Sequence, residues 1–435
     1  MKKKITSILA LFLVSAMIFA ACGAEAPEPT PEPEVLPEIV AEPEVPDDRL
    51  TLHFAMWDEV QAPVYREILD LFTAETGVAV EIVLTPWAQY WLRLDAAAGG
   101  DDLPDVFWMN TFMPRYAEAG VLRPLTDLVE RDNVDMDAWT PAIVELYTRH
   151  DEIWGLPVGH DVVTVYYNRE IFETYDVDTP EPGWTWANML AIAAELRDAI
   201  EDAGDDVYPL VMELDPQSSY FNFIVQNGGF VLDPETSLPG FALPATIRAY
   251  QDVLDLMDAE IMPTFEVLSD TAGIDIFSAE GAAMIYAGSW RASAIDDLPF
   301  AVEIGIIEQP SKAANNYSML NGLSFAMSAT TEYVDEAWEL IQFLAGYEAN
   351  RIRAERGISM PAYLAAYRHY RFDHIDASVI LEALPTAFPF PTHERLTDIL
   401  GILNDVVPQI WDRSLTPREG ADEIQERLLE ALGME

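Results

Sequence analysis

The order of elements between residues 51 and 109 most constrains the fold of this chain. Alternating apolar residues predict a strand over 51–56, and Pro63 begins a helix that ends at Gly77. A strand over 78–84, a helix over 87–98 and a strand over 103–109 follow. Strands that alternate with helices predict a parallel sheet with right-handed crossovers. Binding sites in such sheets lie beyond the carboxyl ends of the strands, where Trp57, Asp58 and Asn110 fall.

The N-terminus has the pattern of an export signal. Three lysines precede an apolar run over residues 5–20, and Ala20 and Ala21 precede Cys22, the only cysteine. We therefore expect a lipoprotein signal peptide over 1–21 and acylation of Cys22. Phe19 stands where such signals usually have leucine, and an ordinary signal peptide with a chance cysteine is the alternative.

An acidic, proline-rich segment follows Cys22. Residues 25–48 hold nine acidic side chains and no basic one, and proline recurs every two to six residues. Such a segment is extended and self-repelling, so we expect 22–48 to be the acylated cysteine and a tether. Residues 49–435 remain, and their length predicts two lobes rather than one core.

The net charge of −51 restricts the possible partners. A polyanion would be repelled, so nucleic acid is excluded as a partner. The acidic surface is typical of a solvated exported protein, and a cationic ligand is the alternative interpretation. Lys312 is the only lysine after the signal peptide, and no internal disulfide is available.

No enzymatic or metal-binding motif stands out. The chain has no phosphate-binding glycine loop, no H-E-x-x-H, no nucleophile elbow and no Cys/His cluster. We expect no metal, no cofactor and no catalytic residue. Paired carboxylates of a glycoside hydrolase stay possible, but among 75 acidic residues some pair is inevitable.

Aromatic and polar residues coincide at predicted strand ends. Sugars present apolar C–H faces that stack on rings and hydroxyls that bind carboxylates and amides. One or both kinds of group occur at four places in the chain: Trp57 with Asp58, Asn110 with Thr111, Asp161, and Trp290 with Arg291. Core packing or capping explains each of these places taken singly, but their joint pattern favours sugar binding.

Several motifs occur in a fixed order along residues 50–430. They are PWAQYWLRLDAAAGGDDLPDVFWMN (86–110), GVLRPLTDLVE (120–130), GLPVGHDVVTVYYNREIFE (155–173), WTWANMLAIAAEL (184–196), NGGFVLD (227–233), EGAAMIYAGSW (280–290) and NGLSFAMSA (321–329). In this order they resemble the extracellular solute-binding proteins of ABC importers, in the sugar-binding family that includes maltose-binding protein.

The resemblance implies a periplasmic-binding-protein-like α/β fold, with two α/β lobes joined by a multi-segment hinge and a ligand cleft between them. The chain would cross between lobes near residues 160–161, 321–324 and 371–378. The N-terminal lobe would then comprise 49–160 and 325–372, and the C-terminal lobe 161–324 and 373–435.

The resemblance also implies ligand contacts. Trp290 matches the stacking tryptophan of the family, and Asp161 matches the acidic residue at the hinge. Thr111 departs from the family, because maltose-binding protein has a carboxylate there, and the aromatic expected after Pro391 is not evident. The full set of expected ligand-binding residues is Trp57, Asp58, Gln89, Tyr90, Asn110, Thr111, Asp161, Gln217, Tyr220, Trp290, Arg291, Asn321 and Met360.

We therefore expect a lipid-anchored substrate-binding subunit of a carbohydrate ABC importer on the extracytoplasmic face of the cell membrane. It would bind a sugar or oligosaccharide and deliver it to a membrane permease, which works with an ATPase. The alternatives are a binding protein for a polyamine or other cationic solute, a surface glycoside hydrolase, and a receptor that hands its ligand to a signalling protein.

Overall fold

An eight-stranded sheet organises one part of the computed structural model, which describes residues 50–97 and 103–434. Its strand order is β13-β7-β12-β3-β1-β2, and β4 and β14 pair with β12. The strands are β1 (Thr51–Met56), β2 (Ala79–Leu84), β3 (Val106–Met109), β4 (Leu122–Arg123), β7 (Leu156–Asp161), β12 (Met319–Ser328), β13 (Met360–Pro361) and β14 (Phe388–Pro389). Strand β1 pairs in parallel with β2 and with β3, which confirms the parallel arrangement predicted for residues 51–109.

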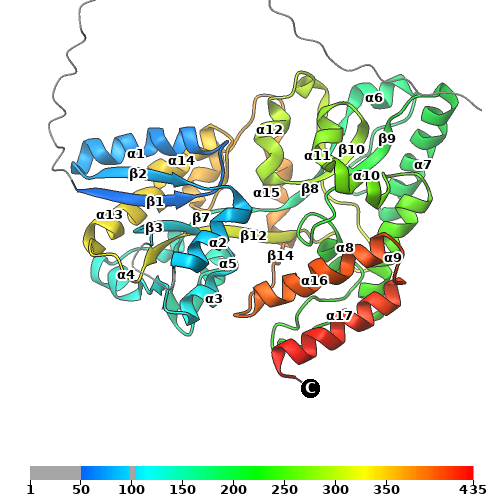
Figure 1. The fold of residues 1–435 in the computed structure, drawn as a ribbon. Helices are drawn as coiled ribbons and strands as arrows, with labels where there is room; N and C mark the ends of the chain where they lie inside the picture. The colour runs from blue at the N-terminus through cyan, green and yellow to red at the C-terminus, as the bar shows by residue number, and fades with distance from the viewer. Residues whose placement is uncertain (1–49, 98–102, 435) are drawn as a thin grey trace, which may run out of the picture. The chain divides into compact units, whose positions relative to one another are not determined.

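Helices cover both faces of this sheet (Figure 1), and the last three residues of β1 are all buried, whereas Thr51 and His53 nearer its start are exposed. Leu52, Phe54 and Met56 pack with apolar residues of α1 and α13. Ala55 packs in the other direction, with apolar residues of α2 and α3. The helices of this part are α1 (Ala62–Thr76), α2 (Trp87–Ala97), α3 (Met113–Glu118), α4 (Thr126–Asp132), α5 (Pro141–Leu146), α13 (Val334–Ala345) and α14 (Tyr347–Glu355). We call this sheet and its helices the first lobe.

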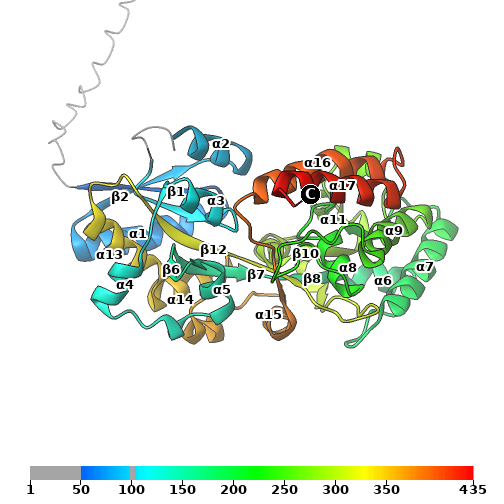
Figure 2. The ribbon, with the colours of Figure 1, turned by 90° about the horizontal axis from the view of Figure 1, so that it is seen from below.

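A four-stranded sheet organises the second lobe, with the order β11-β8-β10-β9. Its strands are β8 (Val163–Asn168), β9 (Tyr208–Met212), β10 (Ala282–Gly288) and β11 (Ile304–Ile307). Its helices are α6 (Arg169–Thr174), α7 (Trp186–Ala203), α8 (Tyr220–Gln226), α9 (Pro244–Asp258), α10 (Phe265–Asp270), α11 (Gly273–Ser278), α12 (Ala292–Asp296), α15 (Ala377–Glu382), α16 (Leu396–Trp411) and α17 (Pro417–Leu432). Figure 2 shows α16 and α17 beside each other in this lobe, where α17 also contacts α9.

The chain passes between the lobes at a very short connection. Only Val162 separates β7 from β8, next to the crossing expected near residues 160–161. The two strands belong to different sheets. The chain returns to the first sheet at β12, which begins at Met319. The residue boundaries of the lobes remain our prediction.

The predicted signal peptide, Cys22 and the acidic tether lie outside the described residues. Within the described residues, no helix is both long enough and apolar enough to cross a membrane.

Candidate functional site

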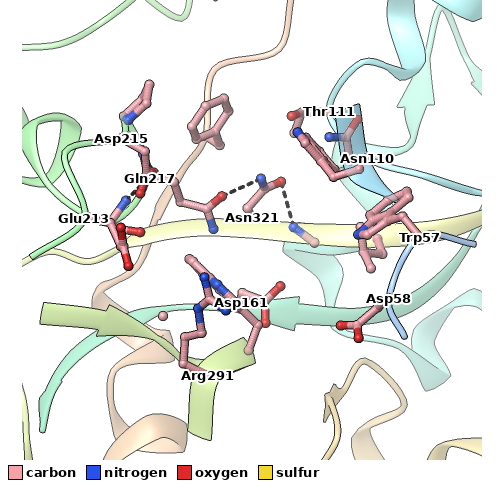
Figure 3. Close-up of a pocket in the computed structure, with 18 of the residues that line it drawn as sticks. Trp57, Asp58, Asn110, Thr111, Asp161, Glu213, Asp215, Gln217, Arg291 and Asn321 are labelled. Atoms are coloured by element: carbon pink, nitrogen blue, oxygen red, sulfur yellow. Dashed lines mark hydrogen bonds between the residues drawn. The ribbon is translucent and has the colours of Figure 1, made fainter. Parts of the chain in front are cut away.

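A cavity of about 640 Å³ lies where the ends of strands from both sheets meet. From the first sheet, β1 leads to Trp57 and Asp58, and β3 leads to Asn110. From the second sheet, β9 and β10 lead to Glu213 and Trp290. Figure 3 shows the polar side chains of both lobes around this cavity. The cavity therefore lies at the carboxyl ends of β1 and β3, the position expected from the sequence.

Most of the residues singled out from the sequence line this cavity. They are Trp57, Asp58, Asn110, Thr111, Asp161, Gln217, Trp290, Arg291 and Asn321. Four others do not line it in this structure: Gln89, Tyr90, Tyr220 and Met360.

Each of these four residues has another environment. The buried Tyr90 donates its hydroxyl to the Trp108 carbonyl at 2.7 Å. Tyr220 packs against the rings of Tyr250 and Trp411 in the second lobe. Met360 is 1% exposed within β13, and Gln89 is exposed on α2.

Helical geometry explains why neighbours on α2 do line the cavity. Trp87 and Trp91 are four residues apart, so they share one side of the helix, and both line the cavity. The sequence showed a stripe of aromatic residues over 87–94 but did not show which of its members turn toward a ligand. Phe112, which follows the predicted pair Asn110 and Thr111, is a further lining residue that the sequence did not single out.

Four tryptophans form an aromatic wall of the cavity: Trp57, Trp87, Trp91 and Trp108. Trp57 contacts the other three. Its ring centroid is 5.0 Å from that of Trp87, 5.6 Å from that of Trp91 and 4.9 Å from that of Trp108. The Trp57–Trp87 and Trp57–Trp108 contacts are edge-to-face, a favourable arrangement for aromatic pairs. The buried Trp91 Nε1 has no hydrogen-bond acceptor in the described part of the chain. The buried Trp108 Nε1 likewise has no acceptor there. The wall thus offers ring surface that is held in place by other rings.

Trp290 contributes an aromatic surface from the second lobe. A methyl group built at Gly288 would lie 2.0, 2.1 and 2.2 Å from three ring carbons of Trp290. Only glycine therefore allows the ring to take this position against the end of β10. Phe390 lines the cavity as well, directly before Pro391, whereas the family resemblance implies an aromatic residue after that proline.

Four carboxylates line the cavity: Asp58, Asp161, Glu213 and Asp215. Oδ1 of Asp58 accepts hydrogen bonds from the backbone N–H groups of Val60 and Gln61 at 2.8 and 3.2 Å. This carboxylate therefore orders the turn that leads into α1.

Asp161 is the last residue of β7. Its Oδ1 accepts a hydrogen bond from the Ser289 hydroxyl at 3.1 Å. Burial raises the pKa of Asp161 to about 7, and the negative charge of Asp58 adds to the rise. This carboxyl therefore exchanges its proton near neutral pH.

Asp215 and Glu213 lie in the second lobe, after β9. Oδ1 of Asp215 accepts from the backbone N–H groups of Gln217 and Ser218 at 2.8 and 2.9 Å. Burial raises the pKa of Asp215, and the charge of Glu213 contributes to the rise. Oε1 of Glu213 accepts from the backbone N–H of Ile274 at 3.1 Å. Glu213 and Asp215 were not among the expected residues, because many carboxylates in this sequence follow strands.

Two amides meet inside the cavity. Asn321 Nδ2 donates to Gln217 Oε1 at 2.9 Å, and Asn321 Oδ1 accepts from the Gly322 backbone N–H at 2.8 Å (Figure 3). Arg291 is the single basic side chain among the described lining residues. Within the described ranges no three His, Cys, Asp or Glu side chains are grouped so as to hold a metal ion.

A family model described as bacterial extracellular solute-binding protein matches residues 57–351. The maltotriose-binding protein of Pyrococcus abyssi is 22% identical over 274 residues, which cover 61% of this chain and 55% of that protein. The multiple sugar-binding protein of Streptococcus mutans is 20% identical over 317 residues, or 68% of this chain and 71% of that protein.

Solved structures are similar over most of the chain. An ABC substrate-binding protein from Listeria monocytogenes, in complex with cycloalternan, has a TM-score of 0.81 at 20% identity and covers 89% of this chain and 100% of its own. A receptor of Streptomyces glaucescens, solved unliganded and with acarbose, has a TM-score of 0.79 at 19% identity, with 88% and 99% covered. These likenesses confirm the predicted periplasmic-binding-protein-like α/β fold.

Proposed function

Because the chain belongs to the bacterial extracellular solute-binding proteins, we propose that it is the substrate-binding subunit of a carbohydrate ABC importer. Its ligand is a sugar or oligosaccharide held in the cavity between the lobes. The observation that carries the proposal is the cavity's combination of an aromatic wall with carboxylate and amide groups. Aromatic rings match the C–H faces of a sugar, and the polar groups match its hydroxyls.

Binding acts by closing the cleft. Trp57 belongs to the first lobe and Trp290 to the second, so one ligand contacts both lobes only when they approach each other. A ligand that makes more contacts in the closed state shifts the population toward that state by its differential affinity. The closed form then docks on the permease and releases the sugar unchanged. The cavity residues therefore bind and orient the ligand, and none of them acts on a bond.

Location and partners are part of the same proposal. The signal pattern before Cys22 and the acidic segment over 25–48 support a lipid anchor and a tether on the extracytoplasmic face of the membrane. A permease and an ATPase complete the importer. Mass spectrometry of the mature N-terminus tests the anchor: we expect an acylated Cys22, and an unmodified cysteine or cleavage elsewhere contradicts it.

The binding proposal is tested by titration. Thermal shift with neutral oligosaccharides should find a sugar that raises the melting temperature, since a ligand of the folded state stabilises it by mass action. Calorimetry with that sugar should then show loss of affinity for Trp290→Ala. Tyr333→Ala is the matched control, because the Tyr333 side chain is 40% exposed and lies outside the cavity lining. Equal affinity of Trp290→Ala and the parent would refute the stacking role.

The same complex tests the absence of catalysis. After prolonged incubation the sugar should be recovered intact, as judged by mass spectrometry. Turnover that disappears in Glu213→Gln or Asp161→Asn would favour the glycoside hydrolase instead.

One observation favours a second candidate function. Four carboxylates line the cavity against one arginine, as expected for a polyamine or another cationic solute. Spermidine belongs in the same thermal-shift screen. Stabilisation by spermidine and by no sugar would replace the carbohydrate proposal with this one.

A further inference from the structure

The charges that line the cavity do not balance. Asp58, Asp161, Glu213 and Asp215 face a single cation, Arg291. The ion pairs of the described residues lie elsewhere, for example Arg115–Asp95 at 3.1 Å and Arg427–Asp405 at 2.9 Å. None of the four cavity carboxylates has a Lys, Arg or His nitrogen within 4.0 Å in the described part of the chain.

Two of these carboxylates keep one oxygen available. Asp161 and Glu213 each use a single oxygen to accept a hydrogen bond from a neighbouring group. No hydrogen bond to Oδ2 of Asp161 or Oε2 of Glu213 occurs within the described ranges. The backbone and Ser289 contacts hold each carboxylate in place, so the second oxygen is ready for a ligand at little entropic cost.

The carboxylates also repel one another in two pairs. The charge of Asp58 raises the pKa of Asp161, and the charge of Glu213 raises the pKa of Asp215. Closing the lobes over a neutral sugar would remove water from these negative charges without placing a positive charge beside them, and this desolvation costs free energy. A positive charge on the ligand would offset that cost, and the tryptophan wall would attract the same charge through its ring faces.

We infer that the ligand of this cavity is an aminated sugar oligomer, whose ammonium groups are bound by Asp161 and Glu213 while its rings stack on the tryptophans. This inference rests on the proposed carbohydrate function and narrows it to a cationic class. The cavity volume of about 640 Å³ and the amides of Gln217 and Asn321 fit an oligomer with hydroxyls better than a thin polyamine.

Three trisaccharides with one backbone test the inference. The β-1,4-linked trimers of glucosamine, of N-acetylglucosamine and of glucose (cellotriose) differ only in the group at C2, which is an amine, an amide or a hydroxyl. Calorimetry at pH 6.0 keeps the amine charged, because amines of this kind titrate near pH 7.7, as an α-amino group does. We expect the glucosamine trimer to bind at least 10-fold more tightly than cellotriose, with an advantage that shrinks as salt is raised.

Isosteric variants locate the effect. Asp161→Asn and Glu213→Gln keep the oxygen that accepts from Ser289 or Ile274 and remove the charge. Each should weaken binding of the glucosamine trimer by about 10-fold to 100-fold, the usual range for hydrogen bonds to charged groups, and weaken binding of cellotriose by a smaller factor, because a neutral hydroxyl loses less than an ammonium group when the charge is removed. Glu195→Gln is the matched control, since Glu195 is exposed on α7 and does not line the cavity.

The outcomes separate the two proposals. Equal binding of the aminated and neutral trimers, or binding of cellotriose alone, overturns the inference and leaves the carbohydrate function standing. Binding of spermidine with no trisaccharide overturns both. Failure of the glucosamine trimer to bind the parent protein also overturns the inference, whatever the variants do.

Discussion

Gly288 holds no ligand-binding group, yet we predict that Gly288→Ala weakens sugar binding. The added methyl would approach a Trp290 ring carbon to 2.0 Å, whereas ordinary contacts begin near 3.4 Å. The ring therefore has to retreat by roughly 1.4 Å, the difference between these two distances. The backbone at Gly288, with φ −75° and ψ 155°, suits alanine, so the substitution acts through the ring rather than through strand geometry.

The magnitude follows from the area of the stacked face. A sugar that covers about a third of the roughly 200 Å² that an aromatic side chain buries removes about 70 Å² from water. At about 25 cal/mol per Å², this contact contributes about 2 kcal/mol. A ring displaced by more than 1 Å loses half or more of the contact, because dispersion decays steeply with distance. We therefore expect the Kd to rise about 5-fold to 30-fold.

Calorimetry on a double-mutant cycle isolates the mechanism. Gly288→Ala should weaken binding in the parent but have no further effect in the Trp290→Ala background. Thermal unfolding of each variant shows whether the fold is intact. An equal loss of affinity in both backgrounds, or none in the parent, would refute the reasoning that the glycine acts by seating the ring.

Three further predictions concern charge. Burial lowers the pKa of His160 to about 3 from 6.5, so the stability that its neutral form contributes is present above pH 6.5 and is lost as the pH falls toward 3. At pH 5 this loss of stability is about 2 kcal/mol. Urea titrations should show the loss in the parent and not in His160→Gln, and a variant that keeps the parental pH dependence would count against the prediction. Lys312→Met should lower the free energy of unfolding by about 2 kcal/mol, because it removes the buried ammonium from Asp252 and leaves Arg248 as the single basic group paired with that carboxylate in the described part of the chain. A change below about 1 kcal/mol in urea titrations would contradict this. At pH 6.0 binding of the glucosamine trimer should release close to one proton from the protein, because the ammonium group of the ligand lowers the pKa of Asp161 from about 7. Calorimetry in buffers of different ionisation enthalpy measures this proton release, and Asp161→Asn should abolish it.

The sequence predicted the first sheet well because its signals are local. Helix starts and stops, such as the proline at 63 and the glycine at 77, fix α1 to within one residue at each end. The strands on either side were recognisable from their apolar runs. The division at Val162 was harder to predict, because no proline or glycine separates the end of β7 from the start of β8, and only pairing with distant strands divides them.

The cavity lining could be predicted only in part. Residues next to strand ends, such as Trp57 and Trp290, were placed correctly in the cavity by local rules. Tyr90 and Trp91 differ by 100° on a helix, and which of them meets a ligand depends on how α2 packs on the sheet. Glu213 and Asp215 carry no distinguishing signal in a chain with 75 acidic residues.

The residues that join the lobes are also residues of the cavity, and this explains how binding and closure can be coupled without a separate relay. Asp161 ends β7, with only Val162 between it and the start of β8, and it pairs in register with Asn321 of β12. Beside it, Val162 accepts from the Ser289 backbone N–H at 2.8 Å at the end of β10. A rotation of one lobe about this junction changes backbone angles at the residues that face the ligand. A ligand group bound to Asp161 and Asn321 therefore favours particular angles at the junction, and with them one relative position of the two sheets.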